Sequence, residues 1–203
     1  MSFVVLSDEM RLFIAVDLSE EAREAIAAEQ QRMAAALGGT KTSLKWVKPD
    51  HAHLTLVFLG RVEAERAASV VETIGGDVDL APFDLVLEGT GAFPPRGAPR
   101  VLWLGTTRGA PELVALERRL SSRVAGVGVE LEARPFHPHL TLGRWRESRP
   151  SDRGRALAAA RPGPIAQVQV RYATLYESKL SPSGAAYTPL TRANLTPRTE
   201  PRT

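Results

Sequence analysis

An internal repeat limits how this chain of 203 residues can fold more than any other feature of its sequence. The hexapeptides 51–56 (HAHLTL) and 137–142 (HPHLTL) agree at five of six positions and lie 86 residues apart. All four histidines of the protein fall within them. Each hexapeptide follows a helix-like segment and a loop, and each alternates apolar and polar residues as a β-strand does. The repeat predicts two similar lobes, each giving one strand to a common cleft.

The strand period of two predicts which side chains of each repeat share a face. The leucines fall on one face, which a helix can bury, and the histidines and threonines fall on the other. The polar face then holds His51, His53, Thr55 and Val57 in the first repeat, and His139 and Thr141 in the second. The opposite face holds Leu54, Leu56 and Phe58, and Leu140 and Leu142.

The rest of the chain mixes strand-like and helix-like segments without the regular alternation of βαβ units. We expect strands at residues 11–18, 44–48, 51–60, 83–88, 101–105, 136–145 and 165–178. We expect helices at residues 20–37, with Ser19 as N-cap, and at 63–74, 110–125 and 152–160, and a Pro/Gly-rich loop at 92–99. This order favours an α+β fold with mainly antiparallel sheets.

Composition excludes several classes of protein. No apolar run approaches the roughly 20 residues of a membrane-spanning helix, and the N-terminus lacks the features of a secretory signal. We therefore expect a cytoplasmic, monomeric protein without a membrane partner. The absence of cysteine excludes disulfide scaffolds, thiolate zinc sites and cysteine nucleophiles. A net charge of +3 with a pI near 9.6 suits an anionic partner without requiring one.

Paired His-x-Thr motifs suit the opening of a cyclic phosphodiester by water. That reaction needs a base on the attacking side of phosphorus and an acid on the leaving side, and histidine can act as either near neutral pH. Acid–base help of this kind contributes ~10²–10⁴-fold. A threonine two residues further along lies ~6.6 Å away on the same face, where its hydroxyl can bond a phosphate oxygen. No metal or other cofactor is required.

Three motifs carry a resemblance to a known family: RLFIAVDL at 11–18, HLTLVFLG at 53–60 after WVKPD, and PHLTLGR at 138–144. They resemble the bacterial RNA 2′,3′-cyclic phosphodiesterases, once called 2′-5′ RNA ligases, of the two-histidine phosphoesterase superfamily. The resemblance implies two pseudo-symmetric α+β lobes around a V-shaped groove, with helices outside. It implies RNA with 2′,3′-cyclic phosphate ends, or small cyclic nucleotides, as substrate and a 2′-phosphomonoester as product. It also implies a possible reverse reaction, ATP-independent 2′-5′ joining.

The same resemblance implies roles for particular residues. His53 and His139 would be catalytic, and Thr55 and Thr141 would bind phosphate. The family domain would span residues 10–190, with 1–9 as an N-terminal extension. The Thr/Pro/Arg-rich composition without periodicity separately predicts a disordered tail at 191–203.

Arg144 matches an arginine that would add a cation to the phosphate site. In a regular strand it falls on the leucine face, and only a bulge at Gly143 would turn it to the other side.

Aromatic residues near the repeats are candidates for stacking on a base. These candidates are Phe13, Trp46 and Phe93, of which Phe93 lies in the Pro-rich loop. Trp46 is nevertheless expected to pack in the core, and the same is expected of Trp103 and Trp145. His51 and His137 are assigned to the rim of the groove.

Two other functions are compatible with the sequence. Four imidazoles on adjacent strands could ligate zinc or nickel in a metal hydrolase, although neither hexapeptide holds an Asp or Glu and the threonines would be unexplained. A non-catalytic RNA- or nucleotide-binding module would keep the groove but tolerate loss of both histidines. The least specific interpretation makes the histidines structural residues with local hydrogen bonds.

Overall fold

The computed structural model describes residues 9–38, 43–181 and 184–197. Within these residues the strands are β1 (Glu9–Val16), β2 (Leu44–Trp46), β3 (Leu54–Glu63), β4 (Phe83–Phe93), β5 (Val101–Arg108), β6 (Leu140–Trp145), β7 (Pro164–Val170), β8 (Tyr172–Ser181) and β9 (Gly184–Asn194). The helices are α1 (Glu20–Ala36), α2 (Ala64–Ile74), α3 (Ala110–Gly126) and α4 (Pro150–Ala159), with a 3₁₀ turn η1 at Pro49–His51.

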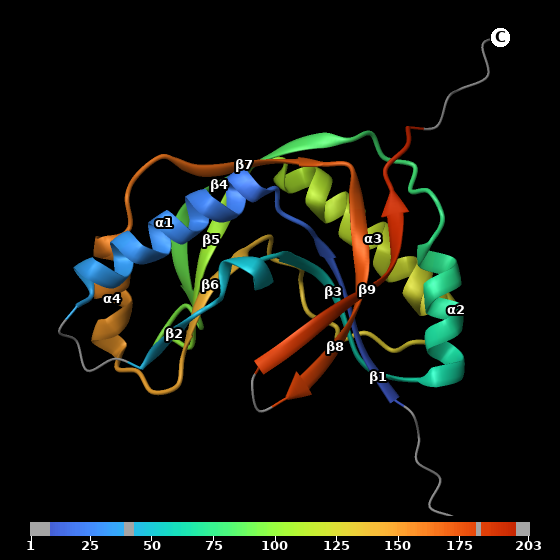
Figure 1. Ribbon diagram of the computed structural model, residues 1–203, viewed down its shortest axis with the longest axis horizontal. Coiled ribbons are helices and arrows are strands. Elements are labelled where there is room, and N and C mark those ends of the chain that lie inside the picture. The colour runs from blue at the N-terminus through green and yellow to red at the C-terminus, as the bar shows by residue number, and fades with distance from the viewer. Residues whose placement is uncertain (1–8, 39–42, 182–183, 198–203) are drawn as a thin grey trace, which may run out of the picture.

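The strands form two sheets whose neighbouring strands are all antiparallel. One sheet, here sheet A, has the order β3-β1-β8-β9, and the other, sheet B, has the order β2-β6-β5-β4-β7. Helices α2 and α3 lie outside sheet A, and α1 and α4 lie outside sheet B (Figure 1). The α+β fold with two lobes and outer helices is therefore confirmed. The repeat's two strands, β3 and β6, belong to different sheets, as predicted.

The lobes are interleaved along the chain. The segment α1–β2 leaves sheet A to join the lobe of sheet B, and α3 follows β5 of sheet B but packs against β3 and α2. Apolar side chains from both lobes form one connected core. This shared core fixes the position of β3 relative to β6.

The predicted start of the first helix is confirmed. The Ser19 hydroxyl accepts a hydrogen bond from the Ala22 backbone N–H at 3.3 Å, which satisfies one of the free N–H groups of the first turn. Glu20 and Glu21 follow in that turn, where negative charge stabilises the helix dipole. Hydrogen bonds from the Glu21 backbone N–H and from Ser19 lower the pKa of the Glu21 carboxyl.

The C-terminal strands differ from the prediction in two ways. The long strand expected at 165–178 is divided at Arg171, because β7 pairs in sheet B and β8 in sheet A. The disordered tail expected from residue 191 is wrong for its first residues, since β9 continues to Asn194. Ala193 and Leu195 are buried at 0% and 4% exposure, and the Val78 N–H donates to the Asn194 carbonyl at 2.7 Å. Small and apolar side chains that alternate along this end of the chain therefore anchor it, although its sequence has no apolar run. Residues 1–8 and 198–203 lie outside the described residues.

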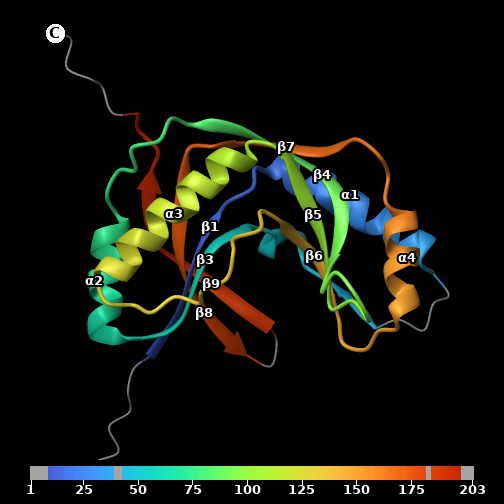
Figure 2. The same ribbon diagram turned by 180° about the vertical axis from the view of Figure 1, so that it is seen from behind.

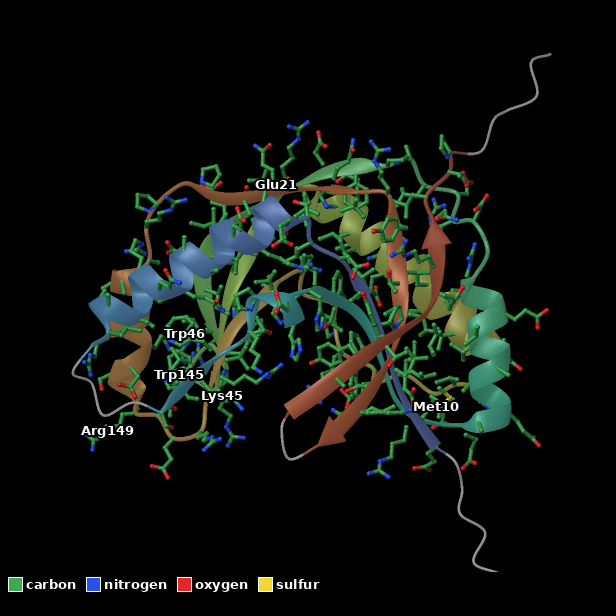
Figure 3. The ribbon with its side chains drawn as sticks, in the orientation of Figure 1. Met10, Glu21, Lys45, Trp46, Trp145 and Arg149 are labelled. Atoms are coloured by element: carbon green, nitrogen blue, oxygen red, sulfur yellow. The ribbon has the colours of Figure 1, made fainter. Side chains whose placement is uncertain are left out.

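Two of the tryptophans pack as expected. Trp145 is 7% exposed and Trp46 packs partly buried against the same core. Both lie in the lobe of sheet B, close to α1 and α4 (Figure 3). Trp46 therefore faces away from the cleft and offers no surface for a base.

Candidate active site

Both repeats contain a β-bulge directly after the threonine. In β3, Ala15 pairs with Thr55 and Ile14 pairs with Val57, so Leu56 is an extra residue. In β6, Trp103 pairs with Thr141 and Leu102 pairs with Gly143, so Leu142 is the extra residue. The residue five positions after each motif histidine is consequently turned to the face of the threonine.

The bulges correct the predicted faces of the strands. Arg144 lies on the Thr141 face, the side from which it could contact a phosphate, and it is exposed. Phe58, expected on the buried leucine face, is instead 47% exposed on the Thr55 face, and Val57 is buried at 4%. The two repeats thus share one pattern of exposure, in which Phe58 and Arg144 occupy equivalent positions.

The motif histidines lie just before their strands rather than within them, and each is held by the same backbone contact. His53 Nδ1 lies 2.8 Å from the carbonyl oxygen of His51, and His139 Nδ1 lies 2.7 Å from that of His137. Because a carbonyl oxygen only accepts, Nδ1 carries the proton in both rings. Nε2 of each ring is left as the nitrogen that can take or give a proton.

Aromatic side chains fix the ring of His53. Phe13 stacks on it with centroids 4.9 Å apart, and Tyr187 meets it edge-on at 5.4 Å. Phe13 was a candidate base-stacking residue, but it is only 4% exposed because it is enclosed by His53, Tyr176 and Tyr187. We assign Phe13 to the positioning of His53 rather than to base contact.

A partly buried carboxylate, that of Asp17, adjoins this aromatic cluster. Asp17 accepts hydrogen bonds from the Thr174 hydroxyl at 2.7 Å and from the Tyr176 hydroxyl at 2.5 Å. Tyr176 in turn stacks on Phe13 at 5.3 Å. Burial and the neighbouring carboxylate raise the pKa of Tyr176, so that its hydroxyl stays protonated and keeps donating to Asp17.

The second histidine has different neighbours. Phe93 meets His139 edge-on at 5.2 Å and His137 at 5.3 Å, and Trp103 lies 5.1 Å from His137. Trp103 was expected only to pack, yet its ladder partner Thr141 places it on the cleft side of sheet B. Its ring occupies the position that a side chain on Gly91 would need, since a Cβ there would lie 2.1 Å from the indole.

Arg144 acts electrostatically on both motif histidines. Burial lowers the pKa of His53 most, and the charge of Arg144 lowers it further, whereas the His51 carbonyl and Asp17 raise it. Burial also lowers the pKa of His139 most, and the charges of His137 and Arg144 add to this. For each ring the charge of Arg144 makes the smallest of these contributions, and the lowered pKa values favour the neutral form of both imidazoles at pH 7.

A cavity of about 550 Å³ joins the two lobes at this point. Its lining includes Thr55 from β3, His139 before β6 and Phe93 from β4. It is closed by Glu117 and Ser121 of α3 and by part of the segment between α3 and β6, residues 127–139, which runs past β3 (Figure 2). Its volume lies within the range of small-molecule sites.

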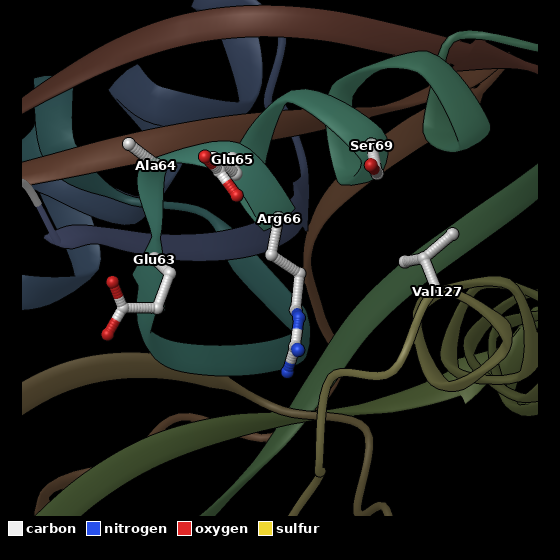
Figure 4. A pocket seen from close by; sticks show the side chains of 6 residues that line it. All are labelled: Glu63, Ala64, Glu65, Arg66, Ser69 and Val127. Atoms are coloured by element: carbon white, nitrogen blue, oxygen red, sulfur yellow. The ribbon is translucent and has the colours of Figure 1, made fainter.

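Another cavity of similar volume, about 550 Å³, lies at the start of α2 (Figure 4). It is lined by Glu63, Ala64, Glu65, Arg66, Ser69 and Val127. None of the residues expected to act in catalysis or phosphate binding reaches it, and Arg66 donates to the Gly128 carbonyl at 2.7 Å. The cavity between the lobes reaches Thr55 and His139 of the candidate site, whereas His53, Thr141 and Arg144 are not among the residues that line it.

Comparison with known proteins agrees with this site. The family model described as the 2′-5′ RNA ligase superfamily matches residues 24–181. An RNA 2′,3′-cyclic phosphodiesterase of Archaeoglobus fulgidus is 33% identical over 180 residues, covering 88% of this chain and 96% of that protein. The chain belongs to the 2′-5′ RNA ligase superfamily.

Further similarities to this superfamily extend over most of the chain. An RNA 2′,3′-cyclic phosphodiesterase of Escherichia coli K12 is 34% identical over 191 residues, covering 94% of this chain and 99% of that protein. The crystal structure of E. coli LigT complexed with 3′-AMP aligns with a TM-score of 0.73 at 32% identity, covering 93% of this chain and 99% of that one. The family resemblance inferred from the motifs is thereby confirmed.

In this member of the 2′-5′ RNA ligase superfamily, Gln30 secures the bulge that turns Arg144. Its side chain is on α1, is 6% exposed, and donates from Nε2 to the carbonyls of Leu142 and Val47, each at 2.9 Å. The Leu142 carbonyl, which belongs to the extra residue of the β6 bulge, also accepts from the Val47 N–H at 2.9 Å. No sequence motif marks Gln30, because its partners are 17 and 112 residues away.

We expect Gln30→Leu to lower the free energy of unfolding by about 1–3 kcal/mol, because the buried carbonyl of Leu142 and the partly buried carbonyl of Val47 each lose a donor. Gln31→Leu is the matched control, since Gln31 is the next residue of α1 and is exposed; its effect should stay within about 0.5 kcal/mol. Denaturant unfolding followed by circular dichroism measures both. Equal effects of the two substitutions would contradict the assignment.

Proposed function

We propose that this chain hydrolyses 2′,3′-cyclic phosphates on RNA ends, or on small cyclic nucleotides, to 2′-phosphomonoesters. One observation carries the proposal: two histidines with the same backbone anchor present Nε2 from different lobes, and Arg144 lies on the Thr141 face of β6 after the second of them. The names of the relatives from A. fulgidus and E. coli support the same activity.

The reaction needs a proton to be removed from water and another to be delivered to the leaving oxygen. Nε2 of one motif histidine takes the proton of the attacking water as the bond from water oxygen to phosphorus forms. Nε2 of the other gives its proton to the ribose 3′ oxygen as the bond from phosphorus to that oxygen breaks. The near-symmetry of the two repeats leaves the assignment of base and acid to His53 or His139 open. The same steps with the 5′ hydroxyl of a second RNA in place of water would form a 2′-5′ phosphodiester as the bond from phosphorus to the 3′ oxygen breaks, without ATP.

We assign the stabilisation of the phosphate to side chains on the threonine faces of β3 and β6. In this proposal the hydroxyls of Thr55 and Thr141 donate to the non-bridging oxygens and Arg144 supplies a positive charge, which their shared strand faces support. Charge that develops on these oxygens in the transition state is stabilised most where donors are fixed in advance. The β6 bulge and the hydrogen bond from Gln30 to the Leu142 carbonyl hold the backbone that carries Arg144.

The residues present do not favour metal chemistry. Among the residues that the structure describes, no three His, Asp or Glu side chains come together as a possible metal site. None of the described helices could span a lipid bilayer.

The test uses an RNA oligonucleotide that ends in a 2′,3′-cyclic phosphate, incubated with the protein in excess EDTA. Alkaline phosphatase removes a phosphomonoester but not a cyclic phosphate, so conversion is read as the appearance of phosphatase-sensitive ends. We expect complete conversion. A protein that binds the RNA without converting it would be a binding module, and conversion only after zinc is added would indicate a metal hydrolase.

The pH dependence follows from the lowered pKa values. A histidine pair that acts as base and acid needs one proton shared between the two rings, so the rate is bell-shaped in pH and reports the pair. Both pKa values lie below 6.5 in the free enzyme, so we expect the optimum of kcat/KM on the acid side of 6.5. A bound phosphate anion raises both pKa values, which moves the optimum of kcat to higher pH. Steady-state profiles measure both, and a kcat optimum more acidic than that of kcat/KM would contradict this.

A further inference from the structure

We propose that Asp17 and Tyr176 are positioning residues for His53, and that they act on its imidazole through the ring of Phe13. This role rests on the proposed function and deepens it, because it makes the two motif histidines unequal although their repeats are nearly identical. Asp17 directly follows β1, and Tyr176 lies in β8, which pairs with β1 at the centre of sheet A (Figure 1). Neither residue belongs to the internal repeat.

The register of sheet A brings these side chains to one face. Phe13 pairs with Tyr176 and Ala15 pairs with Thr174, and partners across an antiparallel ladder project from the same side of the sheet. Asp17 continues the alternation of Phe13 and Ala15 beyond the end of the strand. Because Ala15 carries only a methyl group, it leaves room for the two hydroxyls of β8 to reach Asp17.

Both oxygens of the Asp17 carboxylate have a donor. The Tyr176 hydroxyl donates to Oδ1 at 2.5 Å, and the Thr174 hydroxyl donates to Oδ2 at 2.7 Å. Thr174 is fully buried, and hydrogen bonds to an ionised acceptor are among the strongest in proteins. The carboxylate is therefore held in one orientation, and it holds the phenol ring of Tyr176 in turn.

The ring of Tyr176 transmits this position to His53. Tyr176 stacks on Phe13 with centroids 5.3 Å apart and planes 18° apart, and Phe13 stacks on His53 at 4.9 Å and 28°. Tyr187 of β9 meets the rings of Phe13 and His53 edge-on at 5.1 and 5.4 Å. The His53 imidazole thus has a hydrogen bond at Nδ1 that fixes its tautomer and a stack of rings that fixes its plane.

His139 is supported differently. It has the same backbone anchor at Nδ1, but its ring contacts in the described part of the chain are edge-on or tilted, with Phe93 at 87°, Trp103 at 64° and His137 at 57°. Burial lowers the pKa of His139 most, and the other groups that act on it are His137 and Arg144. Neither of these is an acid.

The negative charge of Asp17 adds an electrostatic effect to the geometry around His53. Burial lowers the pKa of His53 most, the His51 carbonyl and the charge of Asp17 raise it, and the charges of His51 and Arg144 lower it. An opposite charge near an imidazole stabilises its protonated form. An imidazolium that forms at His53 during the reaction is therefore stabilised by Asp17.

Tyr176 remains a neutral donor in this arrangement. Burial raises the pKa of its hydroxyl most, and the hydrogen bond to Asp17 raises it further, whereas Thr174 and the charge of Arg192 on β9 oppose this increase. The phenol therefore keeps its proton throughout the range in which histidine titrates. Proton transfer between Tyr176 and Asp17 does not cancel the charge of the carboxylate.

An NMR titration of the four imidazoles tests the electrostatic effect without any substrate. Asp17→Asn removes the negative charge but keeps an oxygen that accepts a hydrogen bond from a hydroxyl. We expect the pKa of His53 to fall and that of His139 to stay unchanged. Asp84→Asn is the matched control, since it removes an exposed carboxylate of β4 and should move neither histidine. An unchanged His53, or equal shifts of both histidines, would overturn the role of Asp17.

Tyr176→Phe tests the positioning, because it keeps the stacked ring but removes the hydroxyl that joins it to Asp17. We expect kcat for 2′,3′-cyclic AMP to fall by about 10–10²-fold with KM within about twofold, since a small misplacement of a catalytic group slows the chemical step while the phosphate contacts remain. Tyr172→Phe is the control, as it removes another tyrosine hydroxyl of β8 whose ring lies under Arg192, and its kcat should be unchanged.

Two results with Tyr176→Phe would overturn its role: an unchanged kcat, or a rise in KM alone. Failure of the proposed function is recognised separately. A wild-type protein that does not hydrolyse 2′,3′-cyclic AMP would overturn that function, whereas the imidazole titration needs no turnover and still reports whether Asp17 acts on His53.

Discussion

Replacing either motif histidine with alanine is expected to lower kcat by ~10²–10⁴-fold, the usual contribution of one acid or base group. Each histidine presents a single free nitrogen, because Nδ1 donates to the carbonyl of the residue two positions before it. Alanine removes that nitrogen without changing the backbone that carries it. Steady-state hydrolysis of 2′,3′-cyclic AMP measures the loss for His53→Ala and His139→Ala.

The double variant distinguishes a joint mechanism from two separate contributions. Groups that act as a unit are not additive, so we expect His53→Ala/His139→Ala to be little slower than the worse single variant. His51→Ala and His137→Ala are the matched controls, since they delete imidazoles of the same repeats but keep the carbonyls that hold Nδ1. Their losses should be far smaller. Single variants that keep near-normal rates would show that the acid–base assignment is wrong.

The second large effect is expected for Arg144→Ala, at ~10²–10³-fold in kcat, the magnitude seen when one fixed donor to a developing oxyanion is removed. A second readout comes from the histidines. The positive charge of Arg144 lowers the pKa of both, so its removal should move the kcat/KM profile to higher pH. Loss of a merely structural side chain would not produce that shift.

Two further variants control for charge and stability. Arg144→Lys keeps the charge without the fork of donors and should recover part of the rate and most of the original pH profile. Arg118→Ala removes an exposed arginine of α3 and should change neither quantity. An Arg144→Ala enzyme with a reduced rate but an unshifted pH profile would contradict a place for Arg144 beside both histidines.

The sequence was sufficient to predict how the site is built from two repeats. Alternation within the hexapeptides correctly separated Thr55 and Thr141 from the buried leucines, because the chain is extended even where His53 and His139 precede their strands. The bulge needed for Arg144 could be named in advance because Gly143 tolerates it. The corresponding bulge at Leu56 could not, since no glycine marks it, and Phe58 was therefore assigned to the wrong face.

Other parts depended on contacts between distant segments. The stacking of Phe13 on His53 requires β1 to lie beside β3, and the Tyr176–Asp17 hydrogen bond joins residues 159 positions apart. The end of β9 was mistaken for a tail because its strand has few apolar residues and is held by pairing with β8 and by the Val78 segment. Such contacts leave no periodic signal in the sequence, so tertiary packing decided them.

The central claim is that the two His-x-Thr motifs open a 2′,3′-cyclic phosphate by in-line attack of water without a metal. A ³¹P NMR time course of 2′,3′-cyclic AMP with the wild-type protein in excess EDTA tests it most directly. We expect the cyclic phosphate signal to be replaced by that of the 2′-monophosphate alone. A persistent cyclic signal, a 3′-monophosphate product, or turnover that begins only when zinc is added would contradict it.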